Sequence, residues 1–380
     1  MKLCFLAGAD SIHSVKWVKY FADRGHEVHW ISLAPATEAG VNNAKFYPMG
    51  GLFPGRTRPL NFLLHPIYVR RLIARIKPDV LHAHYAGVNG VVGALSGFHP
   101  FVLTAWGSDV LIAAKSRLKG PLVKFALKKA DVITCDADHM RDAMIRLGVN
   151  PEKINIIYFG VDTQKFRPGA SNAALRARLG IFNSPAIISL RSLEPLYDVE
   201  TLINAIPQVL EEVPEAKFVI AGRGSQETEL KELARSLGVS DSTRFIGWVA
   251  NDELPQYLTS VDVYVSTSLS DAGLAASTAE AMACGLPVIV TDSGENSKWV
   301  EEGKSGFIVP VKDAKILAER IILLLQNSEK GARFGEEGRK VIEERDNYSK
   351  EMERMEKIYR RIIQSNGSVS KPKKASPGML

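Results

Sequence analysis

Short apolar runs that alternate with amphipathic helical patterns restrict the fold of this chain more than any other feature. Between the runs, apolar residues recur at helical spacing, as at Ile12, Val15, Val18 and Phe21. A repeated strand, helix, strand order predicts parallel sheets with helices on both faces, and therefore an α/β protein. The predicted strands are LCFLAG, HEVHWIS, DVLHAHY, FVLTAWG, DVITCD, AIISLRS, KFVIAGR, STRFIGW, DVYVST and PVIVTD.

The length of the chain indicates more than one domain. Its 380 residues exceed the roughly 250–300 at which a single hydrophobic core stops growing. A Gly- and Pro-punctuated link at 154–169 marks the break. We expect two doubly wound, Rossmann-like domains facing each other across a cleft, at 1–165 and 166–345. A helix at 346–364 is expected to cross back to the first domain, and 365–380 to form a disordered basic tail.

Charge is distributed unevenly between the two halves. Residues 1–167 hold 22 Lys and Arg against 12 Asp and Glu, net +10, whereas the remainder holds 26 against 30. Clusters at Arg70 to Lys77 and at Lys115 to Lys129 favour an anionic partner such as a phospholipid surface, although solvated helix faces explain them equally well. No basic motif with interleaved aromatic residues is present, so we expect no nucleic-acid partner.

The cysteines and the N-terminal residues bear on location. Cys4, Cys135 and Cys284 stand alone in apolar patterns, which favours a reducing compartment. The stretch MKLCFLAGAD contains too few apolar residues for the hydrophobic core of a signal peptide or for a membrane span. The sequence predicts a cytoplasmic protein, with peripheral contact to a membrane as an option.

The longest recognisable block is AEAMACGLPVIVTD followed by VEEGKSGFIVP. Colinear with it are RGHEVHWIS, DVLHAHY, TAWGSD, IIYFGVDTQKFRP and RFIGWVANDELPQYLTSVDVYVSTS. In this order the motifs resemble retaining GT-B glycosyltransferases of the family 4 type (glycosyl transferases group 1).

This resemblance implies an enzyme that moves a hexose from a UDP- or GDP-linked sugar to a hydroxyl of a glycan, lipid or small-molecule acceptor, with retention at the anomeric carbon. It implies no metal and no cofactor. The alternatives are a nucleotide-sugar epimerase and a non-catalytic module that binds nucleotide sugars.

Donor binding centres on Glu280. In the family, an acid at this position accepts hydrogen bonds from both ribose hydroxyls of the donor. The rival interpretation is that Glu280 complements the dipole of its own helix. The small residues before it would bring backbone amides, at Gly273 and Leu274, close to the diphosphate. We expect Glu280 to be a solvated acid whose removal leaves the fold intact.

The sequence departs from its relatives at two places. One is the segment before Glu280, and the other is the loop after AIISL, which is expected to bind the donor phosphates. Ala272 stands where many relatives carry a first glutamate, and Asp271 is the expected substitute. Arg191 is the main candidate for the phosphates, with an ion pair to Glu194 as the rival interpretation. Tyr197 occupies the position of a lysine in relatives.

Two further cations are expected to help bind the donor phosphates. Arg223, in AGRGSQE, and Lys298 both stand at loop positions expected to face the cleft.

Acceptor binding is expected in the first domain. Asp109 keeps the acid of the family motif, while Trp106 replaces its histidine. We expect Asp109 to position the acceptor or to assist as a general base, with a helix N-cap as the rival role. His84 is expected in the cleft and His82 in packing, since no third metal ligand accompanies them. His13 is expected to shuttle a proton or to contact phosphate.

The acid pair Asp136 and Asp138 matches a metal-binding pattern of the other glycosyltransferase fold. Three residues with two common acids are a weak signal, and we expect a role without metal.

Overall fold

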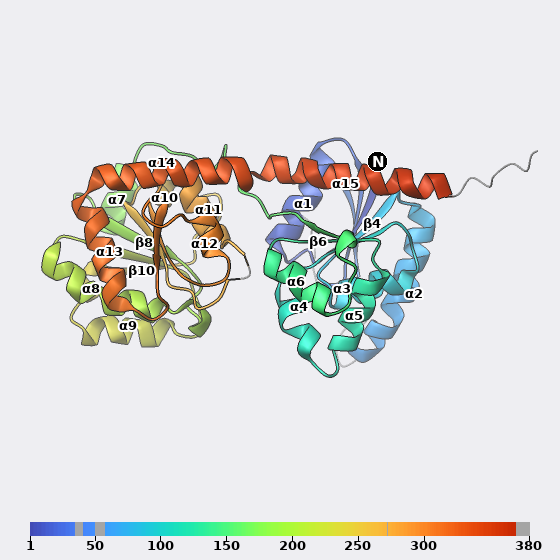
Figure 1. The fold of residues 1–380 in the computed structure, drawn as a ribbon, viewed down its shortest axis with the longest axis horizontal. Helices are drawn as coiled ribbons and strands as arrows, with labels where there is room; N and C mark the ends of the chain where they lie inside the picture. The colour runs from blue at the N-terminus through green and yellow to red at the C-terminus, as the bar shows by residue number, and fades with distance from the viewer. Residues whose placement is uncertain (35–40, 50–57, 272, 370–380) are drawn as a thin grey trace, which may run out of the picture. The chain divides into compact units, whose positions relative to one another are not determined.

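The computed structural model describes residues 1–34, 41–49, 58–271 and 273–369. The chain divides into two compact units (Figure 1). Unit 1 comprises Met1–Tyr158 together with the chain from Lys350 onward, and unit 2 comprises Phe159–Ser349. The break lies at Tyr158, inside the link expected at 154–169 and earlier than the expected boundary after residue 165.

Unit 1 is built on a seven-stranded sheet in the order β3-β2-β1-β4-β5-β6-β7, in which all paired strands are parallel. Its strands are β1 (Lys2–Leu6), β2 (Glu27–Ser32), β3 (Ala44–Pro48), β4 (Val80–His84), β5 (Phe101–Thr104), β6 (Val132–Cys135) and β7 (Ile154–Ile156). Strand β3 was not predicted, because the half-exposed edge segment AKFYP lacks an apolar run.

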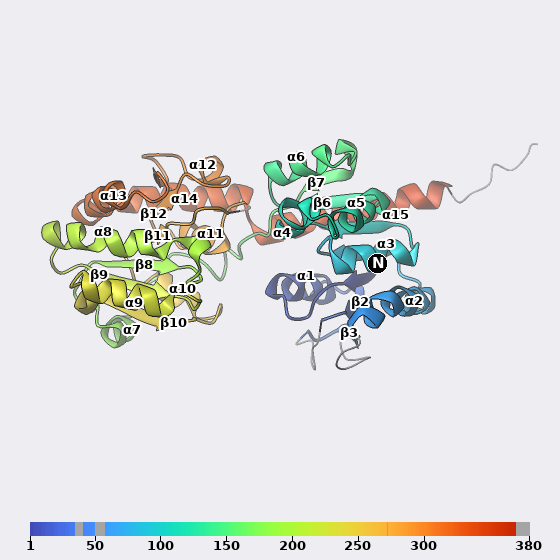
Figure 2. The ribbon, with the colours of Figure 1, turned by 90° about the horizontal axis from the view of Figure 1, so that it is seen from below.

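Helices cover both faces of this sheet. They are α1 (Ile12–Asp23), α2 (Arg58–Ile76), α3 (Val88–Ser96), α4 (Ser108–Leu111), α5 (Gly120–Lys129), α6 (Asp138–Arg146) and α15 (Tyr348–Val369), with 3₁₀ turns η1 (Ala113–Lys115) and η2 (Pro151–Lys153). Rings of α1 and α15 pack on the face that carries Phe5 and His82, whereas α3 packs against Phe101 and Leu103 on the other face. Helices α2 and α3 lie side by side (Figure 2).

The C-terminal helix is longer than the sequence predicted. Helix α15 runs to Val369, so the segment 365–369 is helical and not part of a disordered tail; residues 370–380 lie outside the described residues. The apolar face of this helix is buried and consists of Met352, Met355, Ile358, Tyr359 and Ile362. The hydroxyl of Tyr359 lies 2.5 Å from His82 Nδ1, which ties α15 to the centre of the unit 1 sheet.

Unit 2 holds a six-stranded parallel sheet in the order β10-β9-β8-β11-β12-β13. Its strands are β8 (Ala186–Leu190), β9 (Lys217–Ala221), β10 (Thr243–Gly247), β11 (Val263–Ser266), β12 (Val288–Thr291) and β13 (Gly306–Val309). Neighbouring residues of one strand enter opposite cores, as Ile187 and Ile188 do, because side chains alternate along a strand.

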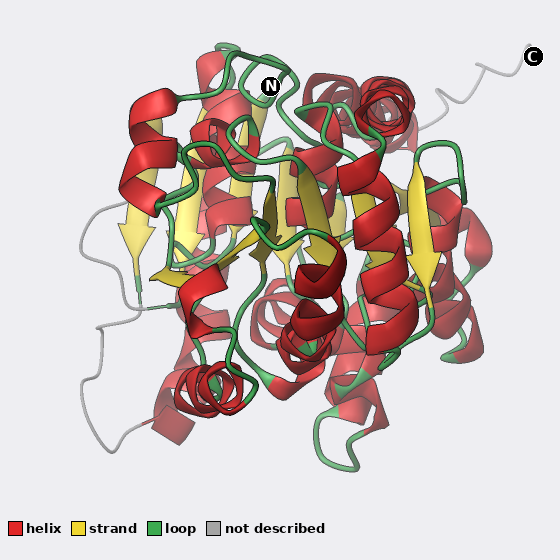
Figure 3. Ribbon diagram, turned by 90° about the vertical axis from the view of Figure 1, so that its left-hand side faces the viewer, coloured by secondary structure: helices red, strands yellow, loops and turns green. Residues whose placement is uncertain are grey.

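The helices of unit 2 form two layers around this sheet, seen as red coils among yellow strands in Figure 3. One layer contains α8 (Val199–Glu212), α9 (Glu227–Ser236) and α13 (Ala314–Gln326). The other contains α7 (Ala173–Leu179), α10 (Leu254–Leu258), α11 (Ala276–Ala283) and α14 (Ser328–Arg345). Helix α12 (Asn296–Trp299) and the turns η3 (Pro195–Tyr197) and η4 (Ser240–Ser242) complete the unit.

The predicted α/β class with two doubly wound, parallel domains is confirmed. In each sheet the strand order reverses once, between β1 and β4 in unit 1 and between β8 and β11 in unit 2. Ligands of such sheets bind beyond the carboxyl ends of the strands, at these reversal points. Within the described ranges, no helix combines the length and the apolar character that crossing a bilayer requires.

Candidate functional site

A pocket of ≈ 340 Å³ opens at the carboxyl ends of β8, β9 and β10 in unit 2. The loops after these three strands supply most of its walls, and Ser277 of α11 supplies a further side. Its lining residues are Leu190, Arg191, Ser192, Ala221, Gly222, Arg223, Trp248, Val249, Leu254 and Ser277. Two of the predicted donor-binding cations, Arg191 and Arg223, therefore share one pocket.

Arg191 forms an ion pair with Asp271. The distance from Nη2 to Oδ1 is 2.5 Å, and each side chain is only 9% exposed. The guanidinium also lies 4.4 Å from the centre of the Tyr197 ring. Glu194, the alternative partner considered for Arg191, instead accepts hydrogen bonds from the amide and hydroxyl of Ser225. Arg191 and Asp271 are thus brought together at the strand-order reversal between β8 and β11.

Two polar atoms of this pair remain unsatisfied. Arg191 Nε and Asp271 Oδ2 are buried and have no hydrogen-bond partner among the described residues. Buried polar atoms are almost always paired, because an unpaired one costs about 1–3 kcal/mol. The pair therefore offers one free donor and one free acceptor to a ligand.

Glu280 lies in the second turn of α11 and is 6% exposed, so the expectation of a solvated acid is wrong. Its Oε1 accepts a hydrogen bond of 3.1 Å from Asn251 Nδ2, in the loop after β10. The small residues of AEAMACG allow α11 to pack tightly against the sheet, and this packing buries the carboxylate. Asn251 was not predicted; its place in the polar loop VANDELP was the available signal.

The loop before α11 carries the predicted backbone donors. Gly273 is buried and Leu274 half-buried, two and one residues before the N-cap Ala275, whose side chain makes no capping hydrogen bond. The neighbouring position Ala272 lies outside the described residues. Gly294, at φ 59°, packs so closely on the Asp271 carbonyl that any side chain there would clash, which fixes the start of this loop.

The remaining predicted cations differ in their surroundings. Arg223 is exposed and makes no side-chain hydrogen bond or ion pair with the described residues, whereas Lys298 Nζ lies 2.8 Å from Glu295 Oε1. Trp248, 67% exposed, stands beside Arg223 in the same pocket. Sequence reasoning placed Trp248 in a strand, but β10 ends one residue earlier, at Gly247 with φ 71°.

Asp109 is fully buried in unit 1. Its carboxylate accepts hydrogen bonds from the backbone amides of Ala86, Trp106 and Val110. Burial raises the pKa of this carboxyl, and the amides partly offset that effect. The N-cap of α4 is Gly107, so the alternative role of Asp109 as N-cap is not observed. Asp109 fixes the loops after β4 and β5 to one another.

The rings of His13, His82 and His84 lie close to those of Trp17 and Trp106. The His84 ring lies 5.1 Å from Trp17 and 5.5 Å from Trp106, between ring centres, and His13 lies 5.4 Å from Trp106. Burial, with a smaller effect of Lys16, lowers the pKa of His13 to about 4. Burial, with a smaller effect of His13, lowers the pKa of His84 to about 3.

His82 is engaged in packing, as predicted. Its two ring nitrogens lie 2.5 Å from the Tyr359 hydroxyl and 2.6 Å from the Thr104 hydroxyl, and burial lowers its pKa well below the usual value. His84, by contrast, lines a pocket of ≈ 270 Å³ at the carboxyl edge of the unit 1 sheet. The structure thus separates the roles of two histidines that point to one face of β4.

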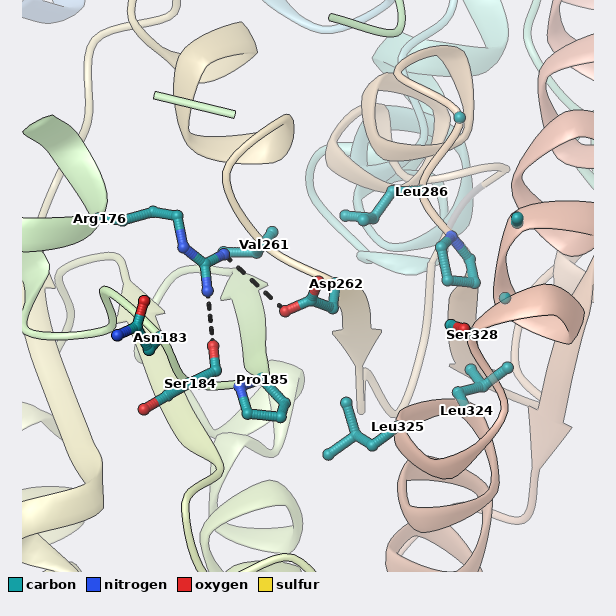
Figure 4. Close-up of a pocket in the computed structure, with 14 residues that line it drawn as sticks. Arg176, Asn183, Ser184, Pro185, Val261, Asp262, Leu286, Leu324, Leu325 and Ser328 are labelled. Carbon is teal, nitrogen blue, oxygen red and sulfur yellow. Dashed lines mark hydrogen bonds and ion pairs between the residues drawn. The ribbon is translucent and has the colours of Figure 1, made fainter. Parts of the chain in front are cut away.

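A second pocket in unit 2, of ≈ 540 Å³, lies at the opposite edge of the sheet. Pro185, Asp262 and Pro287 place it at the amino ends of β8, β11 and β12. Figure 4 shows Arg176 directed at Asp262 and at the Ser184 carbonyl. Its guanidinium also donates hydrogen bonds to the carbonyls of Phe182, Ile181 and Ser260, so this arginine links neighbouring segments of the chain to one another.

In the described part of the chain, no group of three His, Cys, Asp or Glu side chains is arranged to hold a metal ion.

The Arg191–Asp271 pair allows structural and ligand-binding roles to be separated. Arg191→Met should reduce the free energy of unfolding by about 3–5 kcal/mol, because it leaves the buried Asp271 carboxylate without its partner. Arg191→Met combined with Asp271→Leu should recover most of this loss. Urea unfolding of the two single variants and the double variant measures these changes. Full recovery of stability together with full nucleotide binding would mean that the pair is only structural.

Comparison with known proteins matches each unit to a glycosyltransferase family model. The family described as Glycosyl transferases group 1 matches residues 172–341, and Glycosyl transferase 4-like matches residues 2–137. One sequence relative is the GDP-mannose-dependent alpha-(1-6)-phosphatidylinositol monomannoside mannosyltransferase of Mycobacterium tuberculosis, 29% identical over 73% of this chain and 74% of the relative. Another is the N-acetyl-alpha-D-glucosaminyl L-malate synthase of Bacillus anthracis, 24% identical over 95% of this chain and 97% of the relative.

Among solved structures, Anabaena Alr3699/HepE in complex with UDP is similar, with a TM-score of 0.80 and 20% identity over 95% of this chain and 100% of that chain. This similarity shows a shared GT-B fold. The two family matches lie in unit 2 and unit 1 respectively and leave few residues of either sheet uncovered. Unit 2 is therefore similar to Glycosyl transferases group 1, and unit 1 to the family described as Glycosyl transferase 4-like.

Proposed function

We propose that this protein transfers a hexose from a UDP- or GDP-linked sugar to an acceptor hydroxyl with retention of anomeric configuration. Unit 2 binds the donor and unit 1 binds the acceptor. The observation that carries the proposal is the Arg191–Asp271 pair, whose free Nε and Oδ2 match one oxygen of a phosphate and one hydroxyl of a sugar.

Negative charge increases on the donor phosphates as the glycosidic bond breaks. In this proposal Arg191 Nε donates to a phosphate oxygen without leaving Asp271, and Arg223 supplies a second, exposed cation. The amides of Gly273 and Leu274 bind the same diphosphate from the start of α11, and Lys298 contributes charge from α12. Asp271 substitutes for the family's first glutamate by accepting a sugar hydroxyl.

Glu280 binds the two ribose hydroxyls, and Asn251 holds one of its oxygens in place. Exposed Trp248 offers a flat apolar surface for the nucleobase at the same pocket. UDP in the Anabaena structure and GDP-mannose in the mycobacterial relative's name support both nucleotides as donors. Titration with UDP- and GDP-linked hexoses identifies the nucleobase and the sugar of the donor.

On the acceptor side, His84 contacts the acceptor, His13 shuttles a proton or contacts phosphate, and Asp109 fixes the loops after β4 and β5. Asp109 is a positioning residue because its carboxylate is fully buried and engaged by backbone amides. No side chain of unit 2 is proposed as a nucleophile. The acceptor attacks the same face from which the nucleoside diphosphate departs, and the departing phosphate takes the acceptor proton. We propose no metal and no cofactor.

The test combines donor titration with product analysis. Calorimetric titration with UDP- and GDP-linked hexoses identifies the donor, and proton NMR of the product reads the anomeric coupling. Retained configuration supports the proposal. An inverted centre overturns the retaining mechanism, epimerised donor without acceptor identifies an epimerase, and binding without turnover on any acceptor identifies a binding module.

We also propose that this cytoplasmic enzyme meets an anionic membrane through unit 1. Between Asp109 and Asp131 the chain contains six basic residues and no acid. Lys124, Lys128 and Lys129 of α5 are exposed, and Leu118 and Ile112 are 86% and 70% exposed. Cations beside exposed apolar side chains suit a surface of anionic lipid headgroups.

Replacing Lys124, Lys128 and Lys129 by serine should weaken binding to vesicles that contain phosphatidylserine by about tenfold at low salt. The difference should shrink as salt is added, because screening shortens the range of the interaction. Vesicle sedimentation measures it. The matched control replaces three exposed lysines of unit 2, Lys231, Lys304 and Lys315. Equal loss in both triple variants would refute a specific surface on unit 1.

A further inference from the structure

The unit 1 pocket of ≈ 270 Å³ lies at the point where the strand order of its sheet reverses. Gly8, Asp10 and Ser11 follow β1, and Tyr85 follows β4, the two strands that flank the reversal. Loops at such a point form the usual ligand crevice of a doubly wound sheet. The remaining lining residues are Ser14, Ala34, His84, Asn89 and Trp106.

One wall of this pocket contains a polar atom that the protein itself does not satisfy. His84 is 1% exposed, its Nδ1 lies 3.2 Å from Ser14 Oγ, and its Nε2 has no partner among the described residues. A hydroxyl can either donate to a ring nitrogen or accept from a ring N–H, so it satisfies Nε2 in either tautomer. The pocket is therefore built for at least one hydroxyl group.

Two other walls are aromatic and planar. Tyr85 adopts φ 77°, a conformation that is unusual for a bulky residue, and its ring packs against Gly87 so closely that a Cβ there would clash. Trp106 also lines the pocket, and its backbone amide donates a hydrogen bond to Asp109. Flat apolar surfaces beside scattered polar atoms complement a ring that has C–H faces and hydroxyl edges.

The charge of the pocket disfavours an anion. Asp10 is the only formally charged side chain among the described lining residues, and its carboxylate folds back onto Gly8. The positive end of the α1 dipole would attract an anion, but Asp10 already places a negative charge beside it. Lys16, one turn along α1, acts on His13 and does not line the pocket. Phosphate sites usually contain arginine or lysine, and none of the described lining residues is either.

We propose that this pocket binds an uncharged, polyhydroxylated ring of the acceptor, a pyranose or cyclitol unit, with one hydroxyl on His84 Nε2, and that Asp10 excludes the phosphorylated form of the same ring. This inference rests on the proposed transfer reaction and names the chemical class of its acceptor. Asn89, whose amide nitrogen donates to the His84 carbonyl at 3.0 Å, presents its amide oxygen as a second acceptor for a ring hydroxyl.

The experiment compares matched probes on the full chain. Saturation-transfer NMR is recorded with methyl α-glucopyranoside and myo-inositol, and with the phosphate monoesters of both. We expect the neutral probes to bind about tenfold more tightly, equivalent to about 1.4 kcal/mol. Asp10→Lys should abolish or reverse this preference. Asp23→Lys, which makes the same charge change at the far, exposed end of α1, should leave it unchanged.

His84 has its own pair of variants. His84→Ala should weaken the neutral probes about tenfold, and His84→Gln, which retains a donor and an acceptor, should restore part of the affinity. Equal or tighter binding of the phosphorylated probes, the absence of neutral-probe binding, or an Asp10→Lys variant with unchanged preference each overturns the inference. Titration with UDP and GDP in the same samples reports on the donor site of unit 2, so failure of the proposed transfer reaction is recognised separately.

Discussion

Replacing Glu280 by glutamine should lower kcat/KM for glycosyl transfer by about 100- to 1,000-fold, while the protein stays folded. The proposed loss is two charge-assisted hydrogen bonds to the ribose, each contributing about 1.5–3 kcal/mol before partial replacement by the amide. Glutamine keeps an oxygen for Asn251 Nδ2, so the buried side chain remains partnered. Steady-state kinetics with a saturating acceptor, together with a thermal melt, provide the measurement.

Alanine is the less informative variant at this position. Because Glu280 is 6% exposed, Glu280→Ala leaves a cavity and an unpaired Asn251 amide, and stability would fall together with activity. Glu229→Gln, an exposed acid on α9, serves as the matched control. Full activity of Glu280→Gln combined with a lowered melting temperature would establish a purely structural acid and remove Glu280 from the donor site.

Unit 1 should unfold at a higher pH than unit 2 when the protein is acidified. All eight histidines lie between His13 and His139, in unit 1. The pKa is lowered to about 4 for His13, to about 3 for His84 and well below 6.5 for His82. Below pH 6.5 the unfolded chain therefore binds protons that the folded chain excludes, so stability is complete above that pH and falls as the pH drops.

The expected loss is large. At pH 4.5 the buried rings of His13 and His84 each cost roughly 2–3 kcal/mol, roughly 5 kcal/mol together, and His82 adds to this loss. The raised pKa of Asp109 acts in the opposite direction. Such a loss approaches the whole stability of an ordinary domain.

Hydrogen exchange followed by mass spectrometry between pH 7.5 and 4.5 measures each unit separately. Peptides from β1, β4 and α1 should lose protection first. His84→Asn removes one buried ring and should reduce the pH dependence of the melting temperature accordingly. The control His99→Gln removes an exposed ring and should leave the pH dependence unchanged. Earlier loss of protection in unit 2 would contradict the expectation.

The fold could be predicted because its strongest signals are local. Ten apolar runs matched strands, since central strands of a parallel sheet are buried on both faces and so read as continuous hydrophobic segments. Edge strand β3 lacked that signal and was missed. Strand β13, GFIV, carries the signal but was considered only as part of the family motif. Helix α15 was predicted too short because its last residues carry no apolar periodicity.

The candidate site could be predicted only in part. The family motif located Glu280, Asp271 and Arg191, but motif position says nothing about burial or pairing. Whether Arg191 pairs with Glu194 or with Asp271 depends on how the loops after β8 and β11 meet, eighty residues apart in sequence. Tyr85 and Asn89 were missed because their types are common and their neighbours in the pocket lie on other strands.

By itself, the sequence determined the α/β class, the two parallel sheets and the order of the family's motifs, since hydrophobic periodicity and motif spacing are read along the chain. The tertiary structure alone decided that Glu280 is buried beside Asn251, that Arg191 and Asp271 neutralise one another, and that His84 and His82 have different partners. Burial, pairing and pKa depend on residues brought together from distant strands, and their distances are set only when the sheets and helices pack.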